Sequence, residues 1–232
     1  MSPVGELNFP ADAQRDRQSG AQATMAFLLR LRARGVADVD VLRALEKVPR
    51  LSFVPHRYAD LALREMALPI PCGQTIGEPF VTARMLEALD LGAGRRVLEI
   101  GSGSGYSTAL LARLADEVVS YERFQALALE AKIRLRSHGG EKVELIWGDG
   151  LAPSGEKGLF DRILVDAIMS HEEAALVLER LAQGGVMVCA MSEPGEGARL
   201  VRFTQDETGA FSTSPICPCR SSALARGVAK AL

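Results

Sequence analysis

The stretch Val97-Leu98-Glu99-Ile100-Gly101-Ser102-Gly103-Ser104-Gly105-Tyr106 decides the fold of this chain. It begins with a short run that has the character of a buried strand, and a glycine-rich turn follows directly. A helical pattern comes next, with Tyr106, Leu110, Leu111 and Leu114 on one face. A buried strand, a tight turn without side-chain bulk and a helix N-terminus together form a cradle for a nucleotide-type ligand.

Strand and helix patterns alternate through the middle of the chain, which indicates a parallel sheet with helices on both faces. Residues 200–213 differ, because two strand-like runs flank a polar turn and predict an antiparallel hairpin. We therefore expect an α/β fold with a doubly wound, mostly parallel, seven-stranded Rossmann-like sheet that ends in an antiparallel C-terminal hairpin. The expected parallel strands are 96–100, 117–121, 142–146, 161–165 and 186–190. The expected helices between them are 106–115, 124–137 and 171–183, the last ending at Gly184-Gly185.

Patterning also divides the chain from end to end. Residues 1–20 show no apolar period, and helical spacing starts near Gln22. After Pro215 the apolar order is weak, so we expect partial flexibility there. The expected parts are a flexible tail at 1–21, an N-terminal helical addition with a covering loop at 22–80, and the sheet domain at 81–232. The further N-terminal helices are expected at 38–48 and 81–89.

The covering loop, residues 68–80, is too apolar for a solvated linker and too rich in proline for a regular element. A long ordered loop in a compact domain is often functional or a lid. A packed connector with no function is the other interpretation. The residues alone favour neither.

Composition excludes several classes of protein. The chain has 232 residues, 47% of them hydrophobic, with 27 Lys and Arg against 29 Asp and Glu for a net charge of −2. Binding nucleic acid by bulk charge needs a basic face, so we expect no nucleic-acid partner. No apolar run is long enough to span a membrane, and no secretory signal is visible. Four cysteines do not suggest a disulfide framework, and we expect a cytoplasmic protein.

The spacing of the glycines in the turn restricts the class of ligand that the turn can bind. Its glycines stand at 101, 103 and 105, whereas a dinucleotide site needs its third small residue one position later. That position is Tyr106, which is too large for close packing of helix on strand. The chain also lacks the triphosphate motif G-x-x-x-x-G-K-[ST]. A dinucleotide oxidoreductase and a triphosphate site are therefore disfavoured.

Carboxylates follow the predicted strand tips. Glu122 ends the second strand and could accept both ribose hydroxyls, although a solvated carboxylate is the alternative. Asp149 lies between glycines after the third strand and could accept from the amino group of a base, although an ordinary Asp-Gly turn is the alternative. Together with Glu99 they form an acidic set. Such a set suits a cofactor with a nucleoside and a cationic end, such as S-adenosylmethionine.

These residues look like a class I methyltransferase, and several segments resemble the protein-L-isoaspartate O-methyltransferase family. The resemblance runs from about residue 22 to 185. Its motifs are Val48-Pro49-Arg50, Phe53-Val54-Pro55, Leu68-Pro69-Ile70, Gly73-Gln74-Thr75-Ile76, Pro79 and the glycine turn. The resemblance implies S-adenosylmethionine as cofactor and damaged proteins with isoaspartyl residues as substrates. The α-carboxylate is methylated, and the ester then collapses to a succinimide that reopens in part to aspartate.

The resemblance also implies roles for residues. The glycine turn and Glu99 would line the methionine end, Glu122 the ribose, and Asp149 with Gly150 the adenine. The implied cofactor residues are Gln74, Thr75, Glu99, Gly101, Ser102, Gly103, Ser104, Gly105, Tyr106, Glu122, Arg123, Asp149, Gly150 and Asp166. The implied substrate residues are Thr75, Ile76, Gly77, Glu78, Pro79 and Ile168.

The substrate side departs from the family pattern. Gly77 stands where the family has a serine of the substrate site, and Thr75, Ser102 or Ser170 could supply a donor instead. The segment 166–171 is bulkier and more charged than the family's loop, and the family's closing Val-Pro-Leu segment has no clear match.

Three functions stay open on these residues: an isoaspartyl methyltransferase, a divergent relative with another acceptor, and a non-catalytic cofactor-binding module. A carboxylate acceptor is already ionised at pH 7 and needs no base. An amine or hydroxyl acceptor would need one, and His171 and Asp166 are the candidate bases. With Thr75 as a possible donor, the candidate catalytic residues are Thr75, Asp166 and His171. We expect no metal, because Cys217-Pro218-Cys219 lacks metal-ligand spacing and a second pair. We expect a monomer or weak dimer that does not bind membranes.

Overall fold

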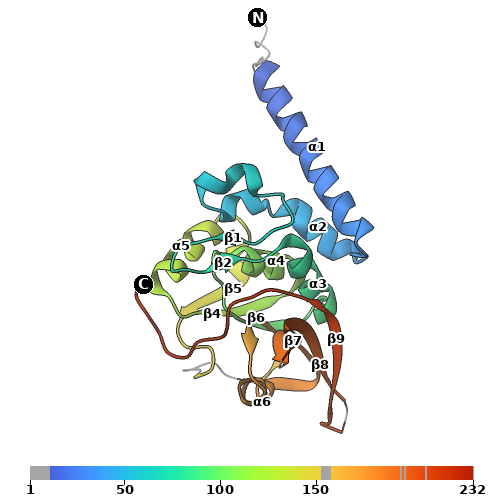
Figure 1. Ribbon diagram of the computed structural model, residues 1–232, viewed down its shortest axis with the longest axis vertical. Coiled ribbons are helices and arrows are strands. Elements are labelled where there is room, and N and C mark those ends of the chain that lie inside the picture. The colour runs from blue at the N-terminus through green and yellow to red at the C-terminus, as the bar shows by residue number, and fades with distance from the viewer. Residues whose placement is uncertain (1–10, 153–157, 194, 196, 207, 232) are drawn as a thin grey trace, which may run out of the picture.

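The computed structural model describes residues 11–152, 158–193, 195, 197–206 and 208–231. Within them the sheet strands are β3 (Arg96–Ile100), β4 (Glu117–Glu122), β5 (Val143–Trp147), β6 (Phe160–Met169), β7 (Leu181–Glu193), β8 (Gly197–Gln205) and β9 (Phe211–Pro218). They form one seven-stranded sheet in the order β5-β4-β3-β6-β7-β8-β9 (Figure 1). Pairing from β5 to β7 is parallel, and β8 and β9 are antiparallel. The predicted α/β fold with a C-terminal hairpin is confirmed.

Helices cover both faces of this sheet. The longer helices are α1 (Ala11–Ala33), α2 (Val39–Lys47), α3 (Pro79–Leu89), α4 (Tyr106–Leu114), α5 (Gln125–Leu135) and α6 (His171–Leu178). The short elements are η1 (Arg50–Phe53), η2 (His56–Leu61), η3 (Gly140–Lys142) and a two-stranded sheet of β1 (Leu68–Pro69) and β2 (Thr75–Ile76). One buried apolar cluster joins α1 through α5 to one face, and α6 packs on the other face. None of the helices in the described part of the chain has both the length and the apolar character to cross a bilayer.

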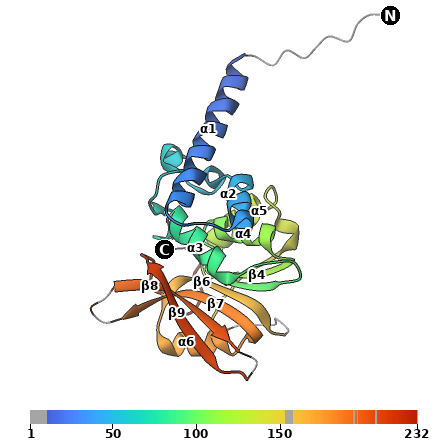
Figure 2. The ribbon, with the colours of Figure 1, turned by 90° about the vertical axis from the view of Figure 1, so that its right-hand side faces the viewer.

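Helix α1 corrects the predicted N-terminal tail. The helix begins at Ala11 rather than near Gln22, so it crosses the expected boundary at residue 21. Its first turns project away from the body, and only its later part reaches the core, where Phe27 and Leu31 are buried (Figure 2). A helix that packs against nothing needs no apolar period, so periodicity could not detect it. Residues 1–10 of the predicted tail lie outside the described residues.

The region around β6 and β7 corrects two further expectations. Strand β6 continues past Val165 to Met169, so the segment after Val165 is not a loop. Its register with β7 shifts between Val165 and Ile168. Helix α6 ends at Leu178, and the Gly184-Gly185 pair lies inside β7 instead of capping a helix. The glycine pair lies where the register of β6 with β7 is irregular, between the pairs Phe160–Leu181 and Arg162–Val186, and Gly184 has a left-handed backbone with φ 70°.

The chain end is ordered by backbone pairing, which corrects the expected flexibility after Pro215. Residues 219–231, here called the C-terminal strap, leave β9 and cross the carboxyl edge of the sheet (Figure 1). Ile168 pairs with the strap on both sides, donating to Ser222 and accepting from Leu224, each at 2.8 Å. Further along, Gln125 N donates to Ala229 O at 2.8 Å. The strap is therefore anchored at β6 and at the start of α5.

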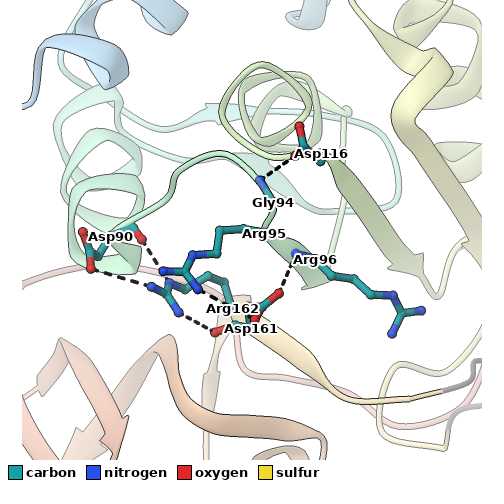
Figure 3. A network of polar contacts seen from close by, with 7 residues as sticks. All are labelled: Asp90, Gly94, Arg95, Arg96, Asp116, Asp161 and Arg162. Atoms are coloured by element: carbon teal, nitrogen blue, oxygen red, sulfur yellow. Dashed lines mark hydrogen bonds and ion pairs between the residues drawn. The ribbon is translucent and has the colours of Figure 1, made fainter.

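A polar network closes the amino edge of the sheet, opposite the strap (Figure 3). The Arg162 side chain is buried, pairs with the Asp90 carboxylate at 3.6 Å and donates to the Asp90 carbonyl at 3.0 Å. Asp161 accepts from Arg96 N at 2.8 Å. These bonds join α3 to the first residues of β3 and β6. They leave the carboxyl edge free for a site.

Candidate active site

Three adjoining cavities lie at the carboxyl edge of the sheet. Gln74 and Asp166 line all three, so the space is continuous. The turn cavity is lined by Gly101–Ser104, Gln74–Gly77, Thr82, Tyr106, Ser107, Glu122 and Asp166. The edge cavity is lined by Tyr121–Phe124, Gly148–Gly150 and Ser222–Ala225, among others. The strap cavity is lined by the covering loop, by Val81, Thr82 and Met85 of α3, and by Cys219–Ser222, among others.

The glycine turn has the conformation that its sequence requires. Gly101, Gly103 and Gly105 have φ values of 97°, 53° and 88°, in the left-handed region that glycine adopts without strain. A Cβ on Gly105 would come within 3.1 Å of Ala131 Cβ, so the third glycine lets α4 pack closely on α5. Gly105 thus serves helix packing, and it is not among the residues that line the three cavities.

Glu122 lies between the turn and edge cavities, as expected for a ribose ligand. Its two oxygens accept from Gly103 N at 2.8 Å and from Phe124 N at 2.9 Å. Burial raises the pKa of Glu122, and these backbone bonds oppose the rise. A carboxylate accepts about four hydrogen bonds, so acceptor capacity is left for two hydroxyls.

Asp149 lines the edge cavity at the tip of β5. Its Oδ1 accepts from Leu151 N at 2.9 Å, and its Oδ2 accepts from Gly227 N of the strap at 2.6 Å. A Cβ on Gly150 would come within 2.6 Å of Ile100, so glycine here is required by core packing rather than only by a flat ligand. The edge cavity therefore has a fixed carboxylate on one side and the strap on the other.

Among the carboxylates predicted to bind the cofactor, Glu99 does not line the three cavities. It is fully buried behind the turn, where Thr108 and Ser120 both donate to its Oε2 at 2.5 Å. Burial raises the pKa of Glu99 to about 7, and hydroxyl bonds, the first from Ser107, oppose the rise. Glu99 thus joins β3, β4 and α4 through Oε2, whereas its Oε1 is buried without a hydrogen-bond partner among the described residues.

Asp166 stands at the centre of the site, since it lines every one of the three cavities. It lies in the irregular part of β6. Burial raises the pKa of Asp166 to about 6. A bound cation would favour its ionised form, so this carboxylate matches a ligand with a positive charge.

The covering loop is held from below by Arg50. This buried side chain donates to Ala62 O at 2.7 Å and to Gly77 O at 2.9 Å, and more weakly to Met66 O at 3.2 Å. Burial lowers the pKa of Arg50. Because the guanidinium has five donors in a rigid fork, one residue can hold several carbonyls together. Arg50 thus positions the segment Gln74–Gly77 over the turn.

The structure brings most predicted site residues together and separates a few. Ile168 is paired with the strap, and Ser170 caps α6 by accepting from Glu173 N. His171 lines a different cavity, with Met191 and Phe203, so it does not share the site with Asp166. Glu78 and Pro79 form the start of α3 and do not line the three cavities. The predicted residues that do line them are Gln74, Thr75, Ile76, Gly77, Gly101, Ser102, Gly103, Ser104, Tyr106, Glu122, Arg123, Asp149, Gly150 and Asp166.

Two parts of the site were missed from sequence. Thr82 lines the turn and strap cavities, and a polar residue on the inward face of α3 was the signal that could have found it. The strap residues from Cys219 to Ala225 line two cavities, and no local signal marks them. No group of three or more possible metal ligands occurs within the described ranges.

The donor set fits S-adenosylmethionine. Glu122 and Asp149 are fixed acceptors along the edge cavity, where a nucleoside has hydroxyls and an amino group. Ser102 and Tyr106 line the turn cavity, and the hydroxyl of each is buried without a partner among the described residues. A buried polar atom without a partner is costly, so these two atoms suit the polar amino-acid end of a ligand.

Comparison with known proteins agrees with this site. A curated relative from Rhodopseudomonas palustris (strain HaA2), protein-L-isoaspartate O-methyltransferase 2, is 44% identical over 208 residues, covering 90% of this chain and 95% of that protein. A Bradyrhizobium sp. (strain ORS 278) protein-L-isoaspartate O-methyltransferase is 48% identical over 182 residues, covering 78% and 84%.

Two solved structures share the fold. One is a Plasmodium falciparum structure described as a protein-L-isoaspartate O-methyltransferase in complex with S-adenosyl-L-homocysteine, with TM-score 0.74, 22% identity and coverage of 86% and 97%. Another, titled protein-L-isoaspartate O-methyltransferase, has TM-score 0.75, 23% identity and coverage of 87% and 66%. The model of the family protein-L-isoaspartate(D-aspartate) O-methyltransferase matches residues 22–226. The chain therefore belongs to the protein-L-isoaspartate(D-aspartate) O-methyltransferase family.

Proposed function

We propose that this chain is an S-adenosylmethionine-dependent methyltransferase that esterifies the α-carboxylate of L-isoaspartyl residues in damaged proteins. The observation that carries the proposal is the continuity of the cavities. The edge and turn cavities have the fixed acceptors for a nucleoside, and the strap cavity opens from the same space beside the covering loop. Family membership supports the same substrate.

Bound S-adenosylmethionine supplies a methyl group on a sulfonium: an acceptor oxygen forms the new O–C bond, the C–S bond breaks, and its electron pair stays on sulfur. The protein's own part is to bind and orient. Glu122 and Asp149 fix the nucleoside end, and Ser102 and Tyr106 offer hydroxyls in the turn cavity. Asp166 places negative charge at the centre of the site. Positioning alone can supply much of the rate, because the acceptor carboxylate needs no base.

The covering loop and the strap exclude water. Arg50 holds the loop over the turn, and the strap is hydrogen-bonded to Asp149 and to Ile168. Removing water strengthens the attraction between a carboxylate and a sulfonium, because both charges then interact in a medium of lower dielectric.

The test uses an isoaspartyl peptide, the same peptide with normal aspartate, and methyl-labelled cofactor. We expect base-labile label on the isoaspartyl peptide only. Calorimetry with S-adenosylhomocysteine runs in parallel. Cofactor binding without label on the isoaspartyl peptide would contradict the proposal.

One observation favours a second candidate, a methyltransferase for another acceptor. Asp166 is a carboxylate with a raised pKa inside the site, which suits a base for an amine or hydroxyl. Label on other acceptors but not on the isoaspartyl peptide would support it. Cofactor binding without transfer to any acceptor would leave the non-catalytic binding module.

A cytoplasmic location is part of the proposal and is supported by the free thiols of Cys72, Cys189, Cys217 and Cys219. A monomer or weak dimer, without nucleic-acid or membrane partners, stays a prediction from the sequence.

A further inference from the structure

The turn cavity and the strap cavity meet at one small surface. The residues that line both are Gln74, Thr75, Gly77, Thr82 and Asp166. If the cofactor occupies the turn and edge cavities, the acceptor must approach from the strap cavity. The acceptor carboxylate is then held at this surface, and it needs a hydrogen-bond donor there.

Thr82 has such a donor. It lies in the first turn of α3, where its backbone N donates to Glu78 O at 3.0 Å. The residue is only 7% exposed, and within the described ranges its hydroxyl makes no hydrogen bond with another residue. A hydroxyl that is nearly buried and lines a cavity without a partner is available to a ligand.

The hydroxyl also lies where a side chain at position 77 would reach. A Cβ built on Gly77 would be 3.4 Å from Thr82 Oγ1. Gly77 is not in the left-handed region, so a serine is compatible with its backbone. Positions 77 and 82 therefore face the same point of the cavity from two elements, the covering loop and α3.

Other residues with hydroxyls near the site do not meet both conditions. Ser221 and Ser222 line the strap cavity and not the turn cavity. Ser102 and Ser107 line the turn cavity and not the strap cavity. Ser170 caps α6 and lines none of the three cavities. Thr75 lines both cavities but is exposed, so water competes for its hydroxyl.

We propose that Thr82 binds the acceptor by donating the hydrogen bond of its hydroxyl to the oxygen of the substrate carboxylate that does not attack. This rests on the proposed function. The proton stays on Thr82 throughout, so the hydroxyl orients the acceptor and takes no part in bond making. The positive end of the α3 dipole lies in the same turn and favours a carboxylate there. The hydroxyl that Gly77 lacks is thereby supplied from a different element.

The experiment compares the full-length wild type with Thr82→Val, Thr82→Ser and the double variant Gly77→Ser/Thr82→Val. Thr82→Val replaces the hydroxyl with a methyl group, Thr82→Ser keeps the hydroxyl, and the double variant returns a hydroxyl to the same point from the loop. Thr213→Val, on the exposed face of β9, is the matched control. Each protein is assayed for kcat/KM on an isoaspartyl peptide, for S-adenosylhomocysteine affinity by calorimetry, and for thermal stability.

A lost hydrogen bond to a charged group predicts a fall in kcat/KM of about 10- to 100-fold for Thr82→Val. The affinity of Thr82→Val for S-adenosylhomocysteine should stay within about twofold of the wild-type value. The kcat/KM of Thr82→Ser should stay near that of the wild type. In the double variant, log kcat/KM should recover by at least about half of the amount that Thr82→Val loses. If the wild type methylates the isoaspartyl peptide and the kcat/KM of Thr82→Val is unchanged, the role of Thr82 is overturned and the proposed function still stands. The role of Thr82 is likewise overturned if Thr82→Ser loses as much activity as Thr82→Val, or if the double variant shows no recovery. No methylation by the wild type would overturn both proposals.

Discussion

The backbone N–H of Gly227 donates a hydrogen bond to Oδ2 of Asp149 at 2.6 Å. The bond joins the last segment of the chain to the carboxylate at the tip of β5, in the wall of the edge cavity. Arg123 strengthens the same connection, since its guanidinium donates to Gly227 O at 3.1 Å. A cofactor in the edge cavity would therefore lie between a strand tip and a strap that hold each other in place.

Asp149→Asn should loosen this strap. An amide has one acceptor oxygen, so its NH2 group must face the N–H of either Leu151 or Gly227, and two donors then oppose each other. We expect affinity for S-adenosylhomocysteine to fall by about 10-fold, and trypsin to cut faster at Arg226 and Lys230. Calorimetry and limited proteolysis measure the two effects. Asp206→Asn is the control, because Asp206 caps the β8–β9 turn with similar bonds far from the site. An unchanged rate of proteolysis in Asp149→Asn would contradict the claim that the hydrogen bond between Asp149 and Gly227 holds the strap in place.

Glu99 should make the protein less stable as pH rises. Its pKa is raised from 4.5 to about 7 in the folded state, so the folded protein holds this proton more tightly than the unfolded chain does. The stabilisation is complete below pH 4.5 and is lost as pH rises to about 7. We expect the free energy of unfolding to fall across this window by up to about 3 kcal/mol relative to Glu99→Gln. Urea denaturation at several pH values measures both proteins, and parallel pH profiles would show that Glu99 is not the cause.

Asp166 should couple cofactor affinity to pH. Its pKa is about 6, and a bound sulfonium favours the ionised carboxylate. Affinity for S-adenosylmethionine should therefore rise by up to about 10-fold as pH increases through 6. Affinity for S-adenosylhomocysteine, which is a neutral thioether at the same atom, should change much less. Calorimetry from pH 5 to 8 with both ligands measures these affinities. Asp166→Asn should abolish the difference in pH dependence between the two ligands. Glu172→Gln, a change at an exposed residue of α6, should keep that difference. A difference that survives in Asp166→Asn would contradict the assignment.

Arg50→Met should disturb the covering loop. The change leaves the carbonyls of Ala62 and Gly77 without their buried donor, which costs about 1 to 3 kcal/mol for each group. We expect lower thermal stability together with a fall of kcat/KM on the isoaspartyl peptide that exceeds the loss of cofactor affinity. The thermal stability and kcat/KM of Arg50→Lys should lie between those of the wild type and Arg50→Met, because an ammonium reaches fewer carbonyls at once than a guanidinium does. Equal losses in peptide methylation and cofactor binding would contradict a role limited to the loop.

Arg162→Met is the counterpart at the opposite edge of the sheet. It removes the bonds to the carbonyls of Asp90 and Asp161 and should lower the free energy of unfolding by about 2 to 4 kcal/mol. Asp90→Asn should cost less than about 1 kcal/mol, since the Asp90 carboxylate is 74% exposed. Denaturation and peptide methylation are both measured, and activity per folded molecule should not change in either variant. A specific loss of activity in Arg162→Met would show that the two edges are coupled.

The local sequence pattern was sufficient to predict those elements whose conformation depends only on residues within the element. The turn from Gly101 to Gly105 needs left-handed backbone at alternate positions, and glycine supplies it without help from elsewhere. Glu122 and Asp149 were expected at one edge because parallel strands end together, and both line the edge cavity. The α/β fold, the sheet and its antiparallel end follow from the same periodicities.

The local sequence pattern did not predict features that depend on contacts between distant parts of the chain. The Gly184-Gly185 pair was expected to end a helix, yet it lies in an irregular stretch of β7, between residues Leu181 and Val186 that both pair with β6. The hydroxyls of Thr108 in α4 and Ser120 in β4, which both donate to Glu99 Oε2, could likewise not be predicted from the spacing along one strand.

The fold, the glycine turn and the strand-tip carboxylates could be predicted from the residues alone, because each depends on spacing along a single strand or turn. Two relationships became visible only in the folded chain: the strap from Cys219 to Ala225 lines the site, and the Thr82 hydroxyl lies beside Gly77. The physical reason is that both relationships depend on packing between elements. No local periodicity records which loop, helix or chain end will face the same cavity.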